Sequence, residues 1–372
     1  MPVLGIGDER SLRPTVCVFQ EPAKFADVAN YDRHEWLTRR QETAIDADRP
    51  IIDPHHHLWD REGSTYLSAE LGRDTQVSHN VKHTVFVECS SAYDEGSSAA
   101  LAPVGETRFA AAQAEEAQRR NGPMIAGIVG HADMSLGEGV DDILVQHEQA
   151  GAGLFRGIRH GTNWSPHRAV KNGHHEPGPG LLLDPTFQAG VRRLGLMGHS
   201  FDAWLYFDQL HELATLAQSV PECAIVVDHL GGPLGIGPHA AERADMVRLW
   251  RDGIVRIASC PNVMLKIGGL GMEHYFGSNW AGYDTPPSSD EVAAFWHDMV
   301  HVAIDSFGPS RCMFESNFPV DRQTLPYTVL WNSFEILAAS YNQAEQHELF
   351  FGTANRFYRL GAEHVLGDSR TG

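Results

Sequence analysis

The sequence predicts an α/β protein whose core is a (β/α)8 barrel, or TIM barrel, preceded by an N-terminal extension. From residue 51 onward, short apolar runs alternate with longer helical patterns, which is typical of repeated βα units and a parallel sheet. Eight such runs are present, the number that closes a barrel. An open doubly wound sheet is the alternative, but the first run leads into histidines where that fold more often carries a glycine-rich phosphate turn.

The elements follow one another in the order that a barrel requires. The candidate strands are Ile51–Asp53, Thr84–Cys89, Met124–Val129, Leu154–Arg159, Phe201–Tyr206, Ala224–His229, Val263–Ile267 and Cys312–Ser316. The helical patterns include Thr107–Arg120, Pro185–Leu194, Asp208–Gln218, Ala240–Ile257, Asp290–Phe307 and Tyr327–Tyr341. Because a barrel of about 250 residues tolerates long loop insertions, we expect one barrel domain over residues 51–372.

Residues 1–50 stand apart from this alternation. They mix proline and charged residues with one short helical stretch near Asp32–Thr43, and they contain no recognisable chemical motif. We expect them to form an extension that packs on the barrel.

Composition narrows the class of protein and its partners. With 42% hydrophobic and 21% charged residues, the chain can bury a sizeable core. Its net charge of −19 would repel nucleic acids and anionic membranes. The five cysteines are far apart, which indicates neither a disulfide framework nor a cysteine zinc site. Without a recognisable signal peptide or a run of membrane-spanning length, a cytoplasmic location is expected, and a homo-oligomer stays open.

The run from Ile51 to Trp59 carries the clearest chemical pattern. On a strand, alternate residues share a face, so Asp53, His55 and His57 would converge on one side. Two neutral imidazoles can capture a divalent metal, and the carboxylate could hydrogen-bond a ring N–H. The alternative is a histidine-rich surface turn.

Two further strand ends carry chemistry. Glu88 ends an apolar run, and a buried carboxylate needs a metal or a cation, so either a metal ligand or an arginine ion pair is expected. His229 could bind metal, orient water or stabilise an oxyanion. A core histidine bonded to the backbone is the alternative for His229.

Two long loops follow strands and are rich in glycine, proline and aromatic residues: His160–Gly180 and Gly271–Ser289. Loops in this position rise on the face of a barrel where substrates bind. The sequence thus predicts a pocket or lid, or else loops that pack their own aromatic residues, and it favours solvated positions for His174 and His175. The aromatic candidates are Trp164, Tyr275, Trp280 and Tyr283.

The motifs together resemble the amidohydrolase superfamily, and within it the amidohydrolase-2 branch that contains sugar-lactone and pyrone-dicarboxylate lactonases. The resemblance extends from about Ile51 to the end of the chain. It implies a (β/α)8 barrel, with His55 and His57 as metal ligands and His229 as a water-orienting or carbonyl-polarising residue; some lactonases of this branch work without a metal. The motifs are Asp-x-His-x-His-x-Trp at 53–59, Gly-Ile-Arg at 157–159, His-Leu-Gly-Gly-Pro at 229–233, Lys-Ile-Gly-Gly-Leu at 266–270, Phe-Glu-Ser-Asn-Phe-Pro at 314–319 and Gly-Thr-Ala-Asn-Arg-Phe-Tyr at 352–358.

The chain departs from this family at its last strand. Asn317 stands where the family has an aspartate that acts as general base, and an amide cannot take a proton from water. We hypothesise that Glu315, on the same strand face, supplies the carboxylate while Asn317 holds substrate or water. Asp321 is a second candidate for the base. Alternatively, Glu315 pairs with a cation and the protein is inactive as a hydrolase.

Arg159 and Lys266 end two further strands, where they would suit a small anionic substrate or, alternatively, pair with Glu88 or Glu315. These residues and motifs favour a hydrolase that opens a lactone of a carboxylated substrate, assisted by a divalent metal, zinc in the first place, or by none. A decarboxylase or hydratase is the first alternative. A small-molecule binder that has lost its base is the second.

Overall fold

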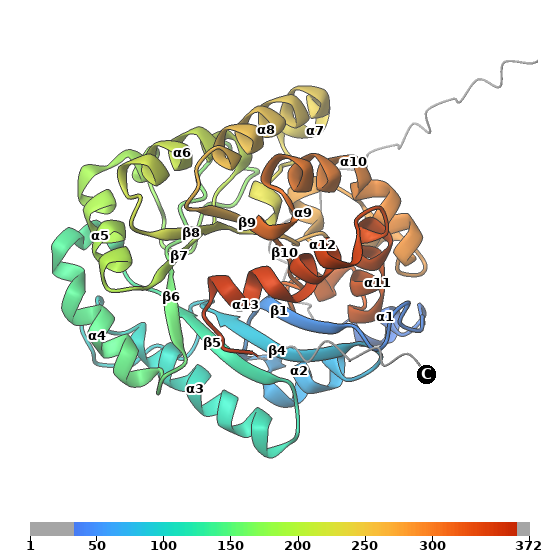
Figure 1. Ribbon diagram of the computed structural model, residues 1–372, viewed down its shortest axis with the longest axis horizontal. Helices are drawn as coiled ribbons and strands as arrows, with labels where there is room; N and C mark the ends of the chain where they lie inside the picture. Colours follow the sequence, from blue (N-terminus) through green and yellow to red (C-terminus); the bar gives the residue numbers. More distant parts are fainter. Residues whose placement is uncertain (1–32, 363–372) are drawn as a thin grey trace, which may run out of the picture.

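The computed structural model describes residues 33–362, apart from the side chains of His274 and Tyr275. Eight strands form one parallel sheet in the order β1-β4-β5-β6-β7-β8-β9-β10 (Figure 1). Their bounds are β1 Pro50–His56, β4 Asn80–Val87, β5 Met124–Gly130, β6 Phe155–Arg159, β7 Ser200–Ala203, β8 Ala224–Val227, β9 Val263–Ile267 and β10 Cys312–Phe314. At the seam between the first and last strands, Asn317 N donates to His55 O at 2.9 Å and His57 N to Phe318 O at 2.7 Å. The sheet therefore forms the predicted (β/α)8 barrel.

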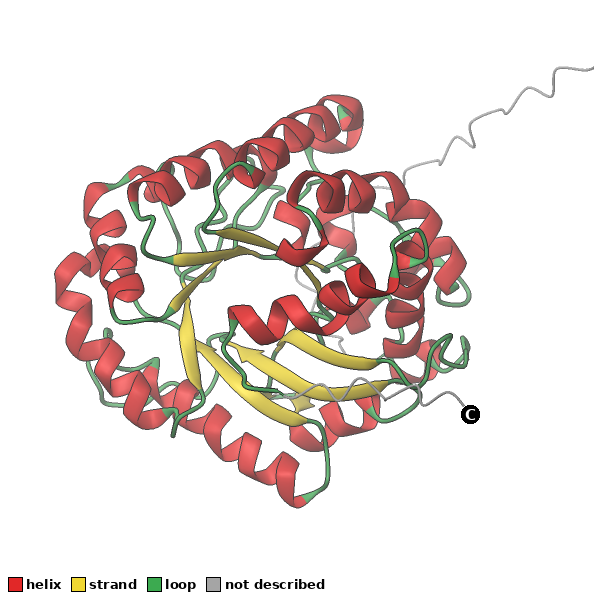
Figure 2. Cartoon of the chain, viewed as in Figure 1, coloured by secondary structure: helices red, strands yellow, loops and turns green. Residues whose placement is uncertain are grey.

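Helices surround the strands as an outer ring (Figure 2). Among residues 33–362, none is long and apolar enough to cross a membrane. The helices are α1 His34–Leu37, α2 Ser68–Thr75, α3 Val104–Arg119, α4 Asp141–Ala150, α5 Pro185–Leu196, α6 Leu210–Ser219, α7 Pro238–Ala241, α8 Arg243–Ala258, α9 Glu273–Phe276, α10 Ser289–Phe307, α11 Tyr327–Ala338, α12 Gln343–His347 and α13 Thr353–Phe357.

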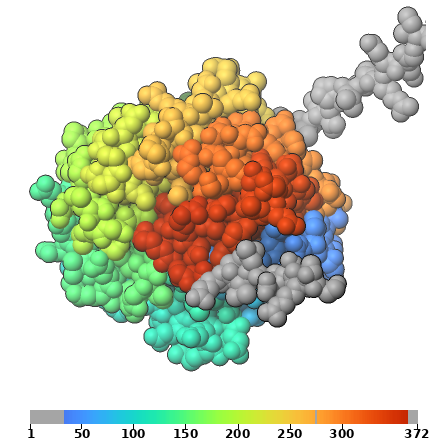
Figure 3. All heavy atoms as spheres, viewed as in Figure 1, coloured from blue at the N-terminus to red at the C-terminus, as the bar shows by residue number. Residues whose placement is uncertain are grey.

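The core has two layers. A large apolar cluster fills the space between the strands and the helices, and a smaller one lies inside the barrel, with Val85 and Val226 among its members. The inner cluster also contains Phe351 and Phe357, so the C-terminal segment closes one end of the barrel, as the red surface in Figure 3 shows. The active site of such a barrel lies at the opposite end, at the C-terminal ends of the strands.

All eight predicted strands are present, although their ends differ by a few residues. The helical pattern Ala240–Ile257 is two helices, α7 and α8, because the backbone leaves the helical region at Glu242. A short hairpin, β2 Trp59–Arg61 with β3 Ser64–Tyr66, was not predicted, since three-residue strands carry too little alternation to be recognised.

The N-terminal extension is less helical than its sequence predicts. Residues 1–32 lie outside the described part of the chain, and the expected helix Asp32–Thr43 is reduced to the single turn α1. Beyond it, residues 38–49 form no further helix and lie against α11, where Asn332 donates to Glu42 and to Thr43 O.

Candidate active site

The ends of the strands bring the predicted histidine pair together. His55 Nε2 and His57 Nε2 lie 3.2 Å apart, and both side chains are buried. His57 Nδ1 lies 2.8 Å from the carbonyl of Val87, which fixes the proton on Nδ1 and leaves a lone pair on Nε2. The predicted convergence of His55 and His57 is therefore present.

Asp53 does not join this pair. Its carboxylate accepts hydrogen bonds from Ser316 N at 2.9 Å and from Tyr327 Oη at 3.0 Å, so it ties β1 to the last strand and to α11. Burial raises the pKa of Asp53 to about 6. Asp53 makes no hydrogen bond to a histidine ring among the described residues, contrary to the expectation, because its two oxygens accept from Ser316 and Tyr327.

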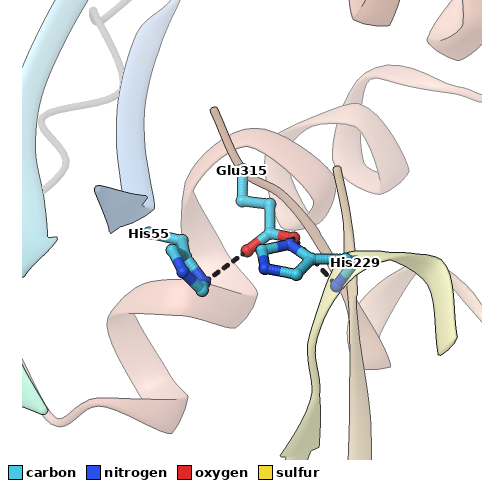
Figure 4. A group of neighbouring side chains, drawn as sticks. All are labelled: His55, His229 and Glu315. Atoms are coloured by element: carbon cyan, nitrogen blue, oxygen red, sulfur yellow. Dashed lines mark hydrogen bonds and ion pairs between the residues drawn. The ribbon is translucent and has the colours of Figure 1, made fainter. Parts of the chain in front are cut away.

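Glu315 holds two histidines from distant parts of the chain, His55 on β1 and His229 in the turn after β8 (Figure 4). Its Oε1 accepts from His229 Nδ1 at 2.7 Å and from His229 N at 3.0 Å, and its Oε2 lies 2.8 Å from His55 Nδ1. Burial by itself would raise the pKa of Glu315, but the imidazoles of His229 and His55 hold it well below its ordinary value. A carboxylate with so low a pKa is a poor proton acceptor. Its geometry suits orientation of the histidines better than the role of base that the sequence predicted.

The turn after β8 presents His229. His229, Leu230, Gly231 and Gly232 all have positive φ, between 51° and 72°. This conformation is costly for residues with a side chain, and strained backbone of this kind clusters at functional sites. It turns His229 back over the barrel, where its Nδ1 reaches Glu315 and its ring packs against the edge of Trp204 at 4.8 Å.

Asn317 is oriented by Asp321. Asn317 Nδ2 donates to Asp321 Oδ1 at 2.8 Å, which directs Asn317 Oδ1 toward His57 Nε2 at 3.3 Å. The second oxygen of Asp321 accepts from Gly271 N at 2.8 Å. Burial raises the pKa of Asp321 to about 7. Asp321 thus fixes the direction in which Asn317 presents its amide.

Arg159 and Lys266 pair with carboxylates inside the barrel. Arg159 Nε donates to Glu88 Oε1 at 2.8 Å, which is the alternative that the sequence left open. Lys266 Nζ lies 2.7 Å from Asp202 and 3.0 Å from Asp228. The structure thus engages both cations in ion pairs and does not support the expectation that they bind an anionic substrate.

Both cations also touch the first histidine. Lys266 Nζ is 3.1 Å from His55 Nδ1, and Arg159 Nη1 is 3.3 Å from His55 Nε2. Asp202 and Asp228 were not among the site residues predicted from the sequence, although Asp202 lies within β7 and Asp228 directly follows β8. That position was the available signal.

Glu88 belongs to a second group of possible metal ligands, with His131 and His175. Burial by itself would raise the pKa of Glu88, but the Arg159 guanidinium together with His131 and His175 lowers it to about 2. The stacked rings of His131 and His175 have their centres 3.6 Å apart, so their lone pairs run side by side and do not converge on one point. His175 is half-buried against His131, contrary to the expectation of a solvated position.

The predicted aromatic lining is described only in part. Trp164 is half-buried, and its backbone N–H donates to Gln209. The side chain of Tyr275 lies outside the described part of the structure. Trp280 is buried against Phe295 of α10, with ring centres 5.3 Å apart, so it packs against the helix that follows its loop.

Comparison with known proteins identifies the family. Residues 52–360 match the family model of the amidohydrolases. The chain belongs to the amidohydrolase family. An uncharacterised relative, y4mH of Sinorhizobium fredii, is 31% identical over 336 residues, which cover 84% of this chain and 100% of the relative. This amidohydrolase is therefore an enzyme of the hydrolase class, and its resemblance to the amidohydrolase-2 branch is confirmed.

Two further proteins are similar to this amidohydrolase. An L-fucono-1,5-lactonase of Burkholderia multivorans is 26% identical over 317 residues, covering 83% of this chain and 96% of the lactonase. A solved amidohydrolase from Burkholderia multivorans with bound zinc has a TM-score of 0.64 and 22% identity, covering 84% of this chain and 99% of that structure. At this identity, the structural likeness concerns the fold.

Amidohydrolases of this superfamily use divalent metal ions, and the donor atoms of the histidine pair fit one. His57 Nε2 and Asn317 Oδ1 are two acceptors that face each other, and among residues 33–362 the only hydrogen-bond donor beside them would be a protonated His55 Nε2. A proton there would point toward the Arg159 guanidinium. The 3.2 Å between the two ring nitrogens is close to the roughly 3.3 Å expected for two imidazoles on one tetrahedral zinc. His55, His229 and Glu315 form an alternative group of donors.

Proposed function

We propose that this amidohydrolase opens a small, uncharged lactone by water attack at the mouth of the barrel, with His229 as the general base. The observation that carries the proposal is the 2.7 Å contact between Glu315 Oε1 and His229 Nδ1. A carboxylate at Nδ1 keeps the proton on that nitrogen, leaves a lone pair on Nε2 and stabilises the imidazolium once Nε2 has taken a proton. Within the described residues, His229 Nε2 makes no hydrogen bond, so it is free for a water molecule.

The proton that His229 accepts from water is returned to the alkoxide of the opened ring. Ester opening makes this return undemanding, because an alkoxide leaving group stays tethered to the product and needs less assistance than an amine. Asn317 Oδ1, held in place by Asp321, lies beside His57 and is an acceptor that orients the attacking water in the proposal. Asp321 is thereby a positioning residue in the proposal, and Glu315 orients the base.

We propose a divalent ion, zinc first, held by His55 and His57 with Asn317 Oδ1 as a third donor. Bound there, zinc supplies Lewis acidity to the carbonyl of the lactone. The buried charges support a cation at this place: Glu88, Asp202, Asp228 and Glu315 outnumber Arg159 and Lys266. Burying unbalanced charge is costly, and a divalent ion offsets it.

An uncharged substrate follows from the same charges. Both buried cations, Arg159 and Lys266, are paired with carboxylates, so neither is left unpaired for an incoming carboxylate. The relative named L-fucono-1,5-lactonase supports a lactone as the reacting group. A decarboxylase needs a site for a substrate carboxylate, which makes it the weaker candidate.

The test is a panel of uncharged 1,4- and 1,5-lactones, carboxylated lactones and aromatic acids, assayed for acid release and for carbon dioxide. We expect acid release from uncharged lactones, and a loss of at least about a hundredfold in kcat for His229→Ala. Carbon dioxide from the aromatic acids would replace the proposal with a decarboxylase. Tight binding of lactones without turnover would indicate a binding protein.

A further inference from the structure

We infer that Arg33, which precedes the amidohydrolase domain, is a positioning residue for the active site. Its guanidinium joins two segments that lie far from it in sequence. Arg33 Nη2 donates to Ala281 O at 3.0 Å, in the long loop after β9, and Arg33 Nη1 donates to Gln323 O at 3.1 Å, in the turn that carries Asp321. One planar side chain thus fastens the loop to the turn.

Arg33 is the first of four side chains that fasten this loop. Trp36 Nε1 donates to Tyr283 O at 2.9 Å, Arg39 Nη1 to Asp284 O at 3.0 Å and Arg40 Nε to Pro286 O at 3.0 Å. We call Arg33, Trp36, Arg39 and Arg40 the clasp. Its donors meet loop carbonyls that have no sheet partner, and a loop with satisfied carbonyls is held in one conformation.

Both segments fastened by Arg33 lead directly to the site. Gly271 begins the loop, and its N–H donates to Asp321 Oδ2 at 2.8 Å, while Thr324 Oγ1 donates back to Gly271 O at 2.7 Å. Asp321 holds Asn317, whose Oδ1 faces His57. A displacement of the turn at residues 321–323 would therefore move the amide that faces the histidine pair.

Arg33 is suited to this task in a way that other clasp members are not. Arg33 Cζ lies 4.0 Å from the centre of the Trp36 ring, so the guanidinium stacks on this ring. The stacking orients the planar group for its hydrogen bonds to the two carbonyls. Arg39 reaches only the loop and makes no hydrogen bond to the turn within the described residues. The family match begins at residue 52, so the clasp is a feature of this chain outside the amidohydrolase domain.

The decisive comparison is Arg33→Gln against Arg39→Gln in the full chain. Both substitutions remove one guanidinium that binds a loop carbonyl, but only the first releases the turn of Asp321. We expect amide hydrogen exchange at Gly271, Thr324 and Leu325 to rise about tenfold in Arg33→Gln and to stay unchanged in Arg39→Gln. Unchanged exchange at these amides in Arg33→Gln would overturn the inference.

Turnover gives a second readout, and this part rests on the proposed function. Because small misplacements cost much rate, Arg33→Gln should lower kcat about tenfold or more with KM changed less than about twofold. Arg39→Gln should keep the wild-type kcat, and Arg33→Lys, which keeps the charge but not the fork, should recover only part of it. Equal kcat losses in both glutamine variants would reject a role through Asp321. If the wild type hydrolyses no lactone, the proposed function fails, while the exchange comparison still decides the role of Arg33.

Discussion

At the scale of single residues, the carboxylate of Glu315 determines how the site can work. It is fully buried and contacts His229 through Oε1 and His55 through Oε2. A carboxylate between two imidazoles keeps a proton on the ring nitrogen that faces it. It also stabilises the imidazolium form of either ring when that ring accepts a second proton. Asn317 stands where the resemblance to the amidohydrolase-2 branch implies an aspartate, and in our proposal His229, oriented by Glu315, is the proton acceptor.

Glu315→Gln should therefore abolish most activity without unfolding the protein. The amide is nearly isosteric, but it cannot stabilise a charged His229 and can rotate to offer its NH2 group to Nδ1, which selects the wrong tautomer. We expect kcat to fall by about 10²- to 10⁴-fold, measured by acid release from the best lactone.

Glu335→Gln is the matched control. Glu335 is another buried glutamate and lies on α11, where its Oε1 accepts from Arg49 Nε at 2.7 Å. Among residues 33–362 it has no contact with the site residues. Its variant should keep the wild-type kcat. Wild-type turnover in Glu315→Gln would remove Glu315 from the mechanism and leave His229 without its orienting partner.

Asp321 should make stability depend on pH in the opposite sense to an ordinary ion-paired carboxylate. Burial raises its pKa from 3.8 to about 7, so the folded state keeps the proton at pH values where the unfolded state has lost it. Its contribution is complete below about pH 4 and is lost as the pH rises through about 7.

The measurement is urea unfolding of the wild type and of Asp321→Asn between pH 4 and 7.5. The free energy of unfolding of the wild type, relative to the variant, should decrease over this range by up to about 4 kcal/mol. Comparing the two proteins cancels the titration of the buried histidines. Parallel curves would show that the carboxyl of Asp321 has an ordinary pKa in the folded protein.

At the scale of elements, the turn after β8 explains why His229 can face Glu315. Four successive residues with positive φ reverse the chain within a few ångströms of the strand end. Gly232 is the tightest position, because a Cβ there would lie 2.0 Å from the carbonyl oxygen of Leu205. The same atom at Gly231 would meet only the side chains of Ile254 and Leu210, at 3.2 Å and beyond.

Gly232→Ala should therefore be far more damaging than Gly231→Ala, although both glycines have positive φ. We expect a loss of about 1–2 kcal/mol in unfolding free energy for Gly231→Ala, from backbone strain and slight crowding. Gly232→Ala should lose more than about 3 kcal/mol, since a backbone carbonyl must move. Urea unfolding followed by circular dichroism measures both. Similar losses would mean that the turn relaxes freely.

At the scale of the whole molecule, the proposed metal would lie at the seam of the barrel. His55 and His57 come from the first strand, and Asn317 follows the last, where few backbone hydrogen bonds join the two. An ion shared between them would link the ends of the sheet as well as serve the reaction. Metal binding should then raise the free energy of unfolding.

Removal of the ion by a chelator should lower the unfolding free energy of the wild type by about 3–4 kcal/mol if free zinc stood about 100- to 1,000-fold above its Kd. His57→Ala should contain no zinc by elemental analysis, and its melting temperature should not respond to the chelator. His297→Ala, which removes an exposed histidine on α10, should behave like the wild type. A chelator response that persists in His57→Ala would place the ion elsewhere, with the group of His55, His229 and Glu315 as the next candidate.

The sequence by itself determined the barrel, the order of its strands and most of the polar residues at the strand ends. It could do so because apolar runs that alternate with helical patterns permit few folds, and parallel strands deliver their C-terminal residues to one mouth. Only the tertiary structure decided which of these residues pair. His229 and Glu315 stand 86 positions apart, and Arg159 and Glu88 stand 71 apart. Contacts across such separations depend on turn conformation and side-chain direction, which the periodicity of a sequence does not encode. The partner of each charged residue is therefore set by the tertiary structure.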